Sequence, residues 1–176
     1  MKYEEKVKET YSSLRDFQKV TVDYLVQRMF DEEQGRMLVA DEVGLGKTWI
    51  AKGVIAQAYA RWCKMANKKS KHFNVYYICS NQQLFTQNLG KVNFTGEKCC
   101  IANDINRISM LALKPLHENE PVQIYALTPN TSFSNKSKQG IKEERSILYA
   151  ILQQTNEFNK LHLSNLLRGH GVQKQN

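Results

Sequence analysis

The stretch ADEVGLGKTWIAKGV, residues 40–54, constrains the fold of this chain more than any other. The short apolar run before it, Arg36 to Ala40, predicts a buried strand. After it, apolar residues recur at helical spacing from Ile50 to Met65, which predicts a helix. Between the two, Gly44 and Gly46 let the backbone curl until its N–H groups and the helix N-terminus point at one anion. The stretch therefore predicts a phosphate-binding loop.

The side chains of this loop predict a nucleotide and a metal. Lys47 is expected to reach the β- and γ-phosphates, and the Thr48 hydroxyl is expected to take one coordination place on Mg²⁺. These two residues are the candidate catalytic residues, and Thr48 is the candidate metal ligand. The alternative is a strand-to-helix turn that reads GxGKT by chance. The expected cofactors are ATP and Mg²⁺, and the loop residues that would hold them are Asp41, Glu42, Val43, Gly44, Leu45, Gly46, Lys47 and Thr48.

The size and composition of the chain limit its class. A chain of 176 residues, of which 41% are hydrophobic, is expected to form one core and a single domain. It has no run of about 18 apolar residues, and its first residues, 1–6, are charged rather than signal-like, so we expect no membrane partner and a cytoplasmic location. Its four cysteines lack CxxC spacing, which favours reduced thiols over a metal site.

The net charge of +8 is unevenly distributed. No acidic residue lies between Glu42 and Glu97, and this interval holds a basic cluster formed by Lys64, Lys68, Lys69 and Lys71. Such a cluster is able to contact a nucleic-acid backbone or to hold a positive field around a polyphosphate. A solvated loop between two elements explains it equally well.

The rest of the chain alternates helical and strand patterns, which predicts an α/β fold. Ser12 or Ser13 is expected to cap a first helix, whose apolar stripe is Leu14, Phe17, Thr21, Tyr24, Leu25 and Met29. Further on, the pattern predicts strands at 73–79, 99–102 and 121–127, helices at 82–92, 105–113, from 141 onward and at 161–167, and a surface loop at 132–140.

Two motifs together resemble a known family. LRDFQ (14–18), followed by DEVGLGKT (41–48), is similar to the opening of the superfamily-two, DEAD/DEAH-type helicases and translocases, and especially to the Snf-like branch, whose loop often begins with Asp. The resemblance implies an incomplete RecA-like P-loop NTPase domain with three layers and a mainly parallel sheet. It would span residues 1–176, with an adenine motif in a helical segment at 1–30 and the strand, P-loop and helix at 36–66.

The resemblance also implies roles for individual residues. Gln18 would recognise adenine, because an amide both donates and accepts hydrogen bonds. YYICSNQQL and LTPNTSF resemble strand-to-loop motifs that touch a nucleic-acid backbone, and the resemblance favours DNA over RNA. Their candidate phosphate contacts are Ser80, Asn81, Thr128 and Thr131. Taken alone, such a glutamine is a surface residue, and such Ser, Thr and Asn clusters are plain turns.

The resemblance stops before the family's hydrolytic residues. That family uses a strand ending in an acidic pair to hold Mg²⁺ and polarise water. Downstream of Thr48, Asp104 is the single degenerate candidate, because Glu143 and Glu144 follow no apolar strand and are better explained as the first turn of a helix. The arginines of a second RecA-like domain are missing as well. We therefore expect the chain to be inactive alone.

Three functions follow from these patterns. The first is the ATP-binding N-terminal portion of an ATP-dependent helicase or translocase, as a truncated or split chain that needs a protein partner or its C-terminal half. The second is a non-hydrolysing module that binds ATP or nucleic acid and acts through a partner. The third, a small P-loop phosphotransferase, ranks last because its expected arginine cluster is absent: Arg107, Arg145 and Arg168 stand apart.

Overall fold

The computed structural model describes most of the chain, namely residues 2–42, 44–66, 70–80, 82–102, 119–127, 142–155 and 159–167. The helices are α1 (Glu4–Ser12), α2 (Asp16–Phe30), α3 (Lys47–Lys64), α4 (Gln82–Val92), α6 (Lys142–Gln154) and α7 (Lys160–Leu167), with a short 3₁₀ turn at Lys98–Cys100. The strands are β1 (Phe73–Ile78), β2 (Ile101–Ala102) and β3 (Val122–Leu127).

The strands form one parallel sheet in the order β1-β3-β2. β3 is central and pairs in parallel with β1, Phe73 facing Val122, and with β2, Ile101 facing Ile124. The carboxyl ends of the three strands therefore lie at one edge of the sheet, and their amino ends lie at the opposite edge. Parallel pairing needs long crossover connections, and α4 lies within the connection between β1 and β2.

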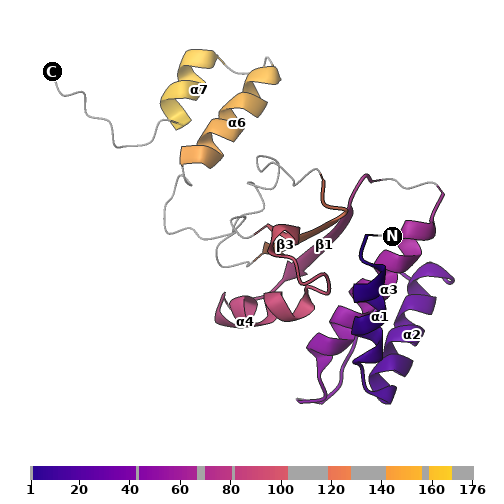
Figure 1. Cartoon of the computed structure of the whole chain (residues 1–176). Coiled ribbons are helices and arrows are strands. Elements are labelled where there is room, and N and C mark those ends of the chain that lie inside the picture. The colour runs from indigo at the N-terminus through magenta and orange to yellow at the C-terminus, as the bar shows by residue number, and fades with distance from the viewer. Residues whose placement is uncertain are drawn as a thin grey trace.

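Helix α3 is the central helix of the body, because it contacts α1, α2, α4 and β1 (Figure 1). On one side it joins a core under the sheet, in which Tyr59 is 1% exposed. Further members of that core come from α1, α4 and β3, including Val7, Val92, Val122 and Ile124. One face of the sheet is therefore covered by a layer of helices. On the opposite face, Tyr76 of the edge strand stays 55% exposed.

A second core lies on the other side of α3, where α2 packs closely against it. Leu14, Val22, Leu25, Val26 and Ile50 form this cluster. Gly53 permits the close approach, since a Cβ atom at this position would lie 2.8 Å from side-chain carbons of both Leu14 and Val22. Helix packing of this kind leaves no room for a larger side chain. The two cores share α3 and hold it in place along its length.

The last two helices, α6 and α7, contact each other. Leu163 of α7 is buried, at 4% exposed, while Leu148, Ile151, Leu161 and Leu166 remain largely exposed. Figure 1 draws this pair of helices apart from the other elements.

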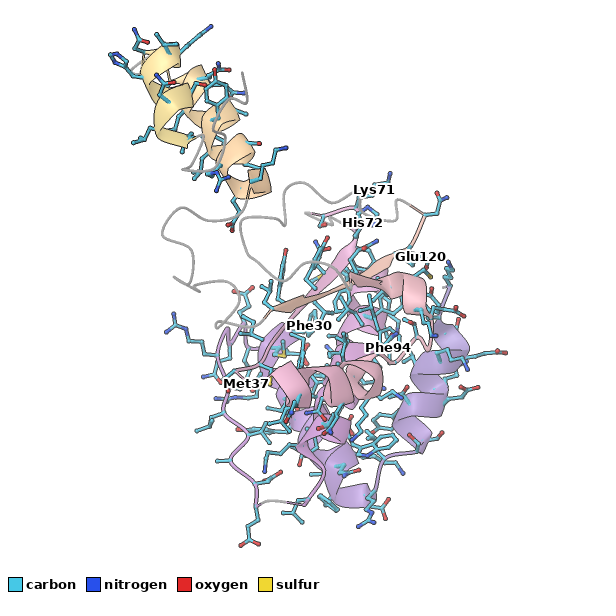
Figure 2. The ribbon with its side chains drawn as sticks, turned by 90° about the vertical axis from the view of Figure 1, so that its left-hand side faces the viewer. Phe30, Met37, Lys71, His72, Phe94 and Glu120 are labelled. Atoms are coloured by element: carbon cyan, nitrogen blue, oxygen red, sulfur yellow. The ribbon has the colours of Figure 1, made fainter. Side chains whose placement is uncertain are left out.

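The strand expected at residues 36–40 is not formed. These residues have neither helical nor strand structure, and within the described part of the chain no strand pairs with them. Met37 and Val39 nevertheless pack on the α2–α3 core, and Leu38 between them is 87% exposed. The segment thus has the alternation of a strand without its hydrogen-bonding neighbour. Figure 2 shows Met37 close to Phe30, at the end of α2.

The N-terminal helix prediction was also wrong in part. The chain forms two helices here, and Ser12 ends α1 instead of capping a helix at its start. α2 begins after Arg15, where the Gln18 side chain accepts a hydrogen bond from the Arg15 backbone N–H. Its buried residues are Gln18, Val22, Leu25 and Val26, so the predicted stripe through Phe17, Tyr24 and Met29 faces mostly outward. Mixed polarity along α2 leaves the sequence pattern ambiguous, because both faces carry apolar residues.

Several expectations lie outside the described residues, among them the helix at 105–113 and the surface loop at 132–140. In the described part, no helix combines the length and the apolar character needed to cross a membrane.

Candidate nucleotide-binding site

The loop before α3 has the backbone conformation that its glycines were expected to permit. Gly44 has φ of 96° and Gly46 has φ of 82°, a region that favours glycine because it has no Cβ. Gly46 is the residue at the N-cap of α3, and the helix begins at Lys47. Val43 lies outside the described residues. The chain therefore turns sharply and enters the helix at the two residues expected to contact phosphate and Mg²⁺.

The start of α3 has no side-chain cap. The first backbone N–H groups of a helix lack intrahelical partners and carry the positive end of the helix dipole. Here the Trp49 N–H donates to the Gly46 carbonyl at 2.8 Å. The N–H groups of Lys47 and Thr48 come before this first hydrogen bond of the helix. Thr48 is half-buried in this first turn. This arrangement suits an anion at the helix start.

The Lys47 ammonium folds back across the loop. It donates hydrogen bonds to the backbone carbonyls of Asp41 at 2.7 Å and of Glu42 at 2.9 Å, and the side chain is exposed. An ammonium has three donors, so at least one remains for a ligand while these two contacts persist. Lys47 is thus held at the mouth of the loop in a position from which a phosphate oxygen is reachable.

Gln18 is in direct contact with the loop, although 27 residues separate it from Leu45. Its Nε2 donates to the Leu45 carbonyl at 3.1 Å, its Oε1 accepts from Arg15 N–H at 3.1 Å, and the residue is 5% exposed. Gly46 is confined by the same amide, because a Cβ there would lie 2.7 Å from Gln18 Nε2. Both ends of the amide are therefore engaged, and Gln18 ties the start of α2 to the loop.

Trp49 is a neighbour of the loop that the sequence analysis did not single out. It is 46% exposed, and its Cδ1 would be 3.5 Å from a Cβ on Gly46. Lys52 places its Nζ 5.4 Å from the centroid of the indole ring. The available signal was a large aromatic residue immediately after the GKT triplet.

The residues expected to contact nucleic acid are placed only in part. Ser80 is exposed and lies just beyond the carboxyl end of β1, where Cys79 N–H extends the pairing with β3 by a 3.1 Å bond to the Leu127 carbonyl. Because β1 and β3 are parallel, the carboxyl end of β3 lies at this same edge of the sheet. The other three candidates, Asn81, Thr128 and Thr131, lie outside the described residues.

Of the basic cluster, Lys64 and Lys71 are placed at the other end of these elements, and Lys68 and Lys69 lie outside the described residues. Lys64 ends α3 and Lys71 precedes β1, and both are exposed. An 18-residue helix such as α3 is about 27 Å long, which exceeds the screening distance of about 8 Å at physiological salt. Lys64 is therefore not expected to contribute a strong field at the glycine loop before α3.

The candidate acidic residues do not complete a hydrolytic site in the described part of the chain. Glu143 and Glu144 lie in the first turn of α6 and therefore do not follow the end of a strand. Asp104, together with Arg107 and Arg168, is outside the described residues, and Arg145 lies in α6.

A second cluster of ionisable side chains lies at the starting end of the sheet. The ligand atoms of Cys99, Cys100 and Glu120 lie within 4.8 Å of one another, a spacing that a metal ion could bridge. The Glu120 carboxylate, however, already accepts hydrogen bonds from Lys2 Nζ at 2.7 Å and from the Tyr3 hydroxyl at 2.5 Å. The Cys100 thiol adds a weaker contact at 3.8 Å. The Glu120 carboxylate is therefore already hydrogen-bonded by three neighbouring side chains.

These contacts change the pKa values of the cluster. The hydrogen bond from Lys2, followed by that from Tyr3, lowers the pKa of Glu120. Burial raises the pKa of the Tyr3 hydroxyl and of the Cys99 thiol, so both stay protonated at neutral pH. His72 adds a structural link, since its Nδ1 lies 2.9 Å from the Glu120 carbonyl oxygen. Figure 2 shows His72 and Glu120 at the same end of the sheet.

Comparisons with protein families, with curated proteins and with solved structures found no match to this chain. The resemblance to Snf-like helicases therefore remains an expectation from the sequence motifs alone.

We predict that Glu120 stabilises the fold in a pH-dependent way. A carboxyl whose pKa is lowered by folding stabilises the protein above its unfolded pKa, here about 4.5, and this stabilisation is lost as the pH falls through the lower folded value. Glu120→Gln should therefore reduce the free energy of unfolding at pH 7 by at least about 1 kcal/mol. The difference from the unmodified protein should shrink when urea unfolding is repeated between pH 4.5 and pH 3.

The matched control is Glu9→Gln, which removes an exposed carboxylate paired with Lys6 at 2.9 Å. Exposed pairs of this kind contribute about 0 to 1 kcal/mol, so this variant should be close to the unmodified protein at every pH. Equal effects of the two substitutions at pH 7 would show that the Glu120 cluster does not stabilise the fold.

Proposed function

We propose that this chain binds Mg·ATP through the loop at 41–48 and is the ATP-binding portion of an ATP-dependent, Snf-like helicase or DNA translocase. The single observation that carries the proposal is the contact between Gln18 and the loop. The two motifs that define the family resemblance are far apart in the sequence, yet the Gln18 amide lies 3.1 Å from the Leu45 carbonyl. A GxGKT turn that arose by chance would not explain the contact between Gln18 and the loop.

Three further features support a triphosphate ligand. The paired glycines have positive φ, the start of α3 has no side-chain cap, and the Lys47 ammonium is held at the mouth of the loop. Glycine-rich turns that feed an uncapped helix suit phosphate through backbone N–H groups and the helix dipole. Thr48, in the first turn of α3, would provide the hydroxyl ligand for Mg²⁺.

In this proposal Gln18 acts first as a support for the loop. Its Oε1 and one of its N–H groups are already used by the backbone, which leaves one N–H and one lone pair for an adenine edge. Nucleic acid would bind at the edge where Ser80 leaves the sheet, the protein would work in the cytoplasm, and a three-layer RecA-like domain would be completed by further strands. Stepping along DNA would require a partner or a second domain that supplies the missing acidic and arginine groups.

We predict that Lys47→Ala abolishes nucleotide binding. The substitution removes the positive charge that would offset the β- and γ-phosphates, and a hydrogen bond to a charged group contributes about 1.5 to 3 kcal/mol. Titration with a fluorescent ATP analogue in the presence of Mg²⁺ measures the effect. A change in affinity of less than about threefold, or roughly 0.65 kcal/mol, would exclude the assigned site.

Lys160→Ala provides the control for charge. Lys160 is exposed at the start of α7, and its loss lowers the net charge by the same amount without touching the loop. The control should bind the analogue like the unmodified protein. Equal losses in both variants would mean that the analogue binds by net charge alone.

We further predict that the chain by itself does not hydrolyse ATP above background. Binding that stabilises substrate and transition state equally does not raise turnover. Acceleration needs groups aimed at the attacking water and at the charge that develops on the γ-phosphate, and the sequence offers no acidic pair after a strand. Steady-state phosphate release, with and without DNA, tests this prediction. Turnover on the order of 1 s⁻¹ that disappears in Lys47→Ala would instead identify a complete enzyme.

A fourth prediction concerns DNA. Binding to the edge at Ser80 should be weak, indifferent to base sequence and steeply weakened by salt, because counterion release supplies most of its free energy. Ser80→Glu should place a negative charge against the phosphates and reduce affinity for labelled single- or double-stranded DNA by about tenfold, or 1.4 kcal/mol.

Asn74→Asp is the matched control, because it adds one negative charge at the other end of β1, six residues and about 20 Å from Ser80. DNA affinity that ignores salt, or that falls equally in both variants, would contradict this edge as the DNA-binding surface.

A further inference from the structure

The aromatic residue beside the phosphate loop carries an inference that rests on the proposed ATP site and extends it. Trp49 follows Lys47 and Thr48 directly and lies in the first turn of α3. Nearly half of it, 46%, is exposed, whereas the next residue, Ile50, is 1% exposed and anchors the helix in the core. The helix is therefore fixed, and the indole is presented at its start.

The position of the ring relative to the loop follows from Gly46. A Cβ on Gly46 would lie 2.7 Å from Gln18 Nε2 and 3.5 Å from Trp49 Cδ1. Gln18 Nε2 and Trp49 Cδ1 are thus at most about 6 Å apart, next to the last glycine of the loop. A nucleotide whose phosphates lie on the N–H groups of the first helical turn would extend its ribose and base from this same point.

The surroundings of the ring suit a nucleoside. Leu45, on the loop itself, is 43% exposed and provides a further apolar surface. Lys52 Nζ lies 5.4 Å from the ring centroid and brings a positive charge. Such an exposed cation–π contact contributes about 0.5 to 1 kcal/mol, while stacking of a base on an aromatic side chain contributes about 1 to 3 kcal/mol. A base therefore competes successfully with the ammonium for the ring.

We propose that Trp49 is the base platform of this site, an indole on which the adenine ring of the bound nucleotide stacks while Lys47 and the loop hold its phosphates. The binding site then has two parts. The loop recognises triphosphate, and Trp49 together with the remaining donor and acceptor of Gln18 recognises the nucleoside. Only ligands that carry a base use the second part.

The test compares two ligands that share the phosphates and differ in the base. Isothermal titration of the full chain with Mg·ATP and with Mg·tripolyphosphate measures both parts of the site. Trp49→Ala should weaken ATP binding about tenfold, equivalent to 1.4 kcal/mol, and change tripolyphosphate affinity by less than twofold. Trp49→Phe, which keeps an aromatic ring, should stay within threefold of the unmodified protein for both ligands.

Tyr24→Ala is the matched control. Tyr24 is also an exposed aromatic residue, at 57%, with a cation over its ring, since Arg28 Cζ lies 5.7 Å from the centroid. Tyr24 lies six residues after Gln18, which is about 9 Å further along α2. Removing its ring should therefore leave both affinities unchanged. Circular dichroism of each variant at the titration temperature checks that the helices are intact.

Fluorescence gives a second readout that does not depend on a loss of affinity. The chain has two tryptophans, and Trp62 is half-buried in the core beside Tyr59. Saturating ATP should change the emission of the unmodified protein, tripolyphosphate should not, and the change should vanish in Trp49→Phe.

The outcomes separate this proposal from the proposed function. Equal weakening of ATP and tripolyphosphate in Trp49→Ala would make Trp49 a support for the loop and overturn the base platform, while the ATP site would stand. Unchanged ATP affinity in Trp49→Ala would also overturn it. If the unmodified protein bound neither ligand, the ATP site itself would fail, and the platform with it.

Discussion

The hydrogen bond between the Gln18 amide and the Leu45 carbonyl is the contact on which the arrangement of this site depends. It joins the beginning of α2 to the turn that begins α3, and the two helices continue from there in close contact at Gly53. Gln18 is buried, so breaking this contact would leave a buried N–H group without an acceptor, which costs about 1 to 3 kcal/mol. The loop is thereby positioned by a buried polar contact and not by its own sequence alone.

This support matters because the usual support is absent. A phosphate loop is ordinarily anchored by the strand before it, within a sheet. Here the residues before the loop contact the α2–α3 core through Met37 and Val39 and form no strand pairing in the described part of the chain. Leu38 faces outward at 87% exposed. An apolar, unpaired segment of this kind is a natural place for a further strand to add, and it is also a risk for aggregation.

The sequence predicted the local features of the site well, and the reason is physical. A glycine-rich turn, a helix with Ile50 and Ala58 at helical spacing and the β-prone run at 73–79 are determined by neighbouring residues. What it missed depends on distant contacts. The strand at 36–40 needs a partner strand, and the first helix, α1, is fixed by contacts such as Tyr3 with Glu120, 117 residues away. The buried face of α2 was predicted only in part, because α2 carries apolar residues on both faces.

The two ends of the body differ in how far their polar groups are already hydrogen-bonded. At the start of the sheet, Glu120 gathers Lys2, Tyr3 and Cys100 into a closed hydrogen-bonded group that ties the N-terminus to β3. At the start of α3, Lys47 is held by backbone carbonyls alone, and the helix N–H groups lack a cap. A closed group has little to gain from a ligand, whereas an open one gains the contacts that it lacks. A ligand bound at the loop would also stabilise the chain, because binding to the folded state shifts the folding equilibrium. Gln18 and Ile50 connect the loop to the α2–α3 core. A bound ligand would therefore stabilise these two helices directly, and it would stabilise the sheet only through its contact with α3.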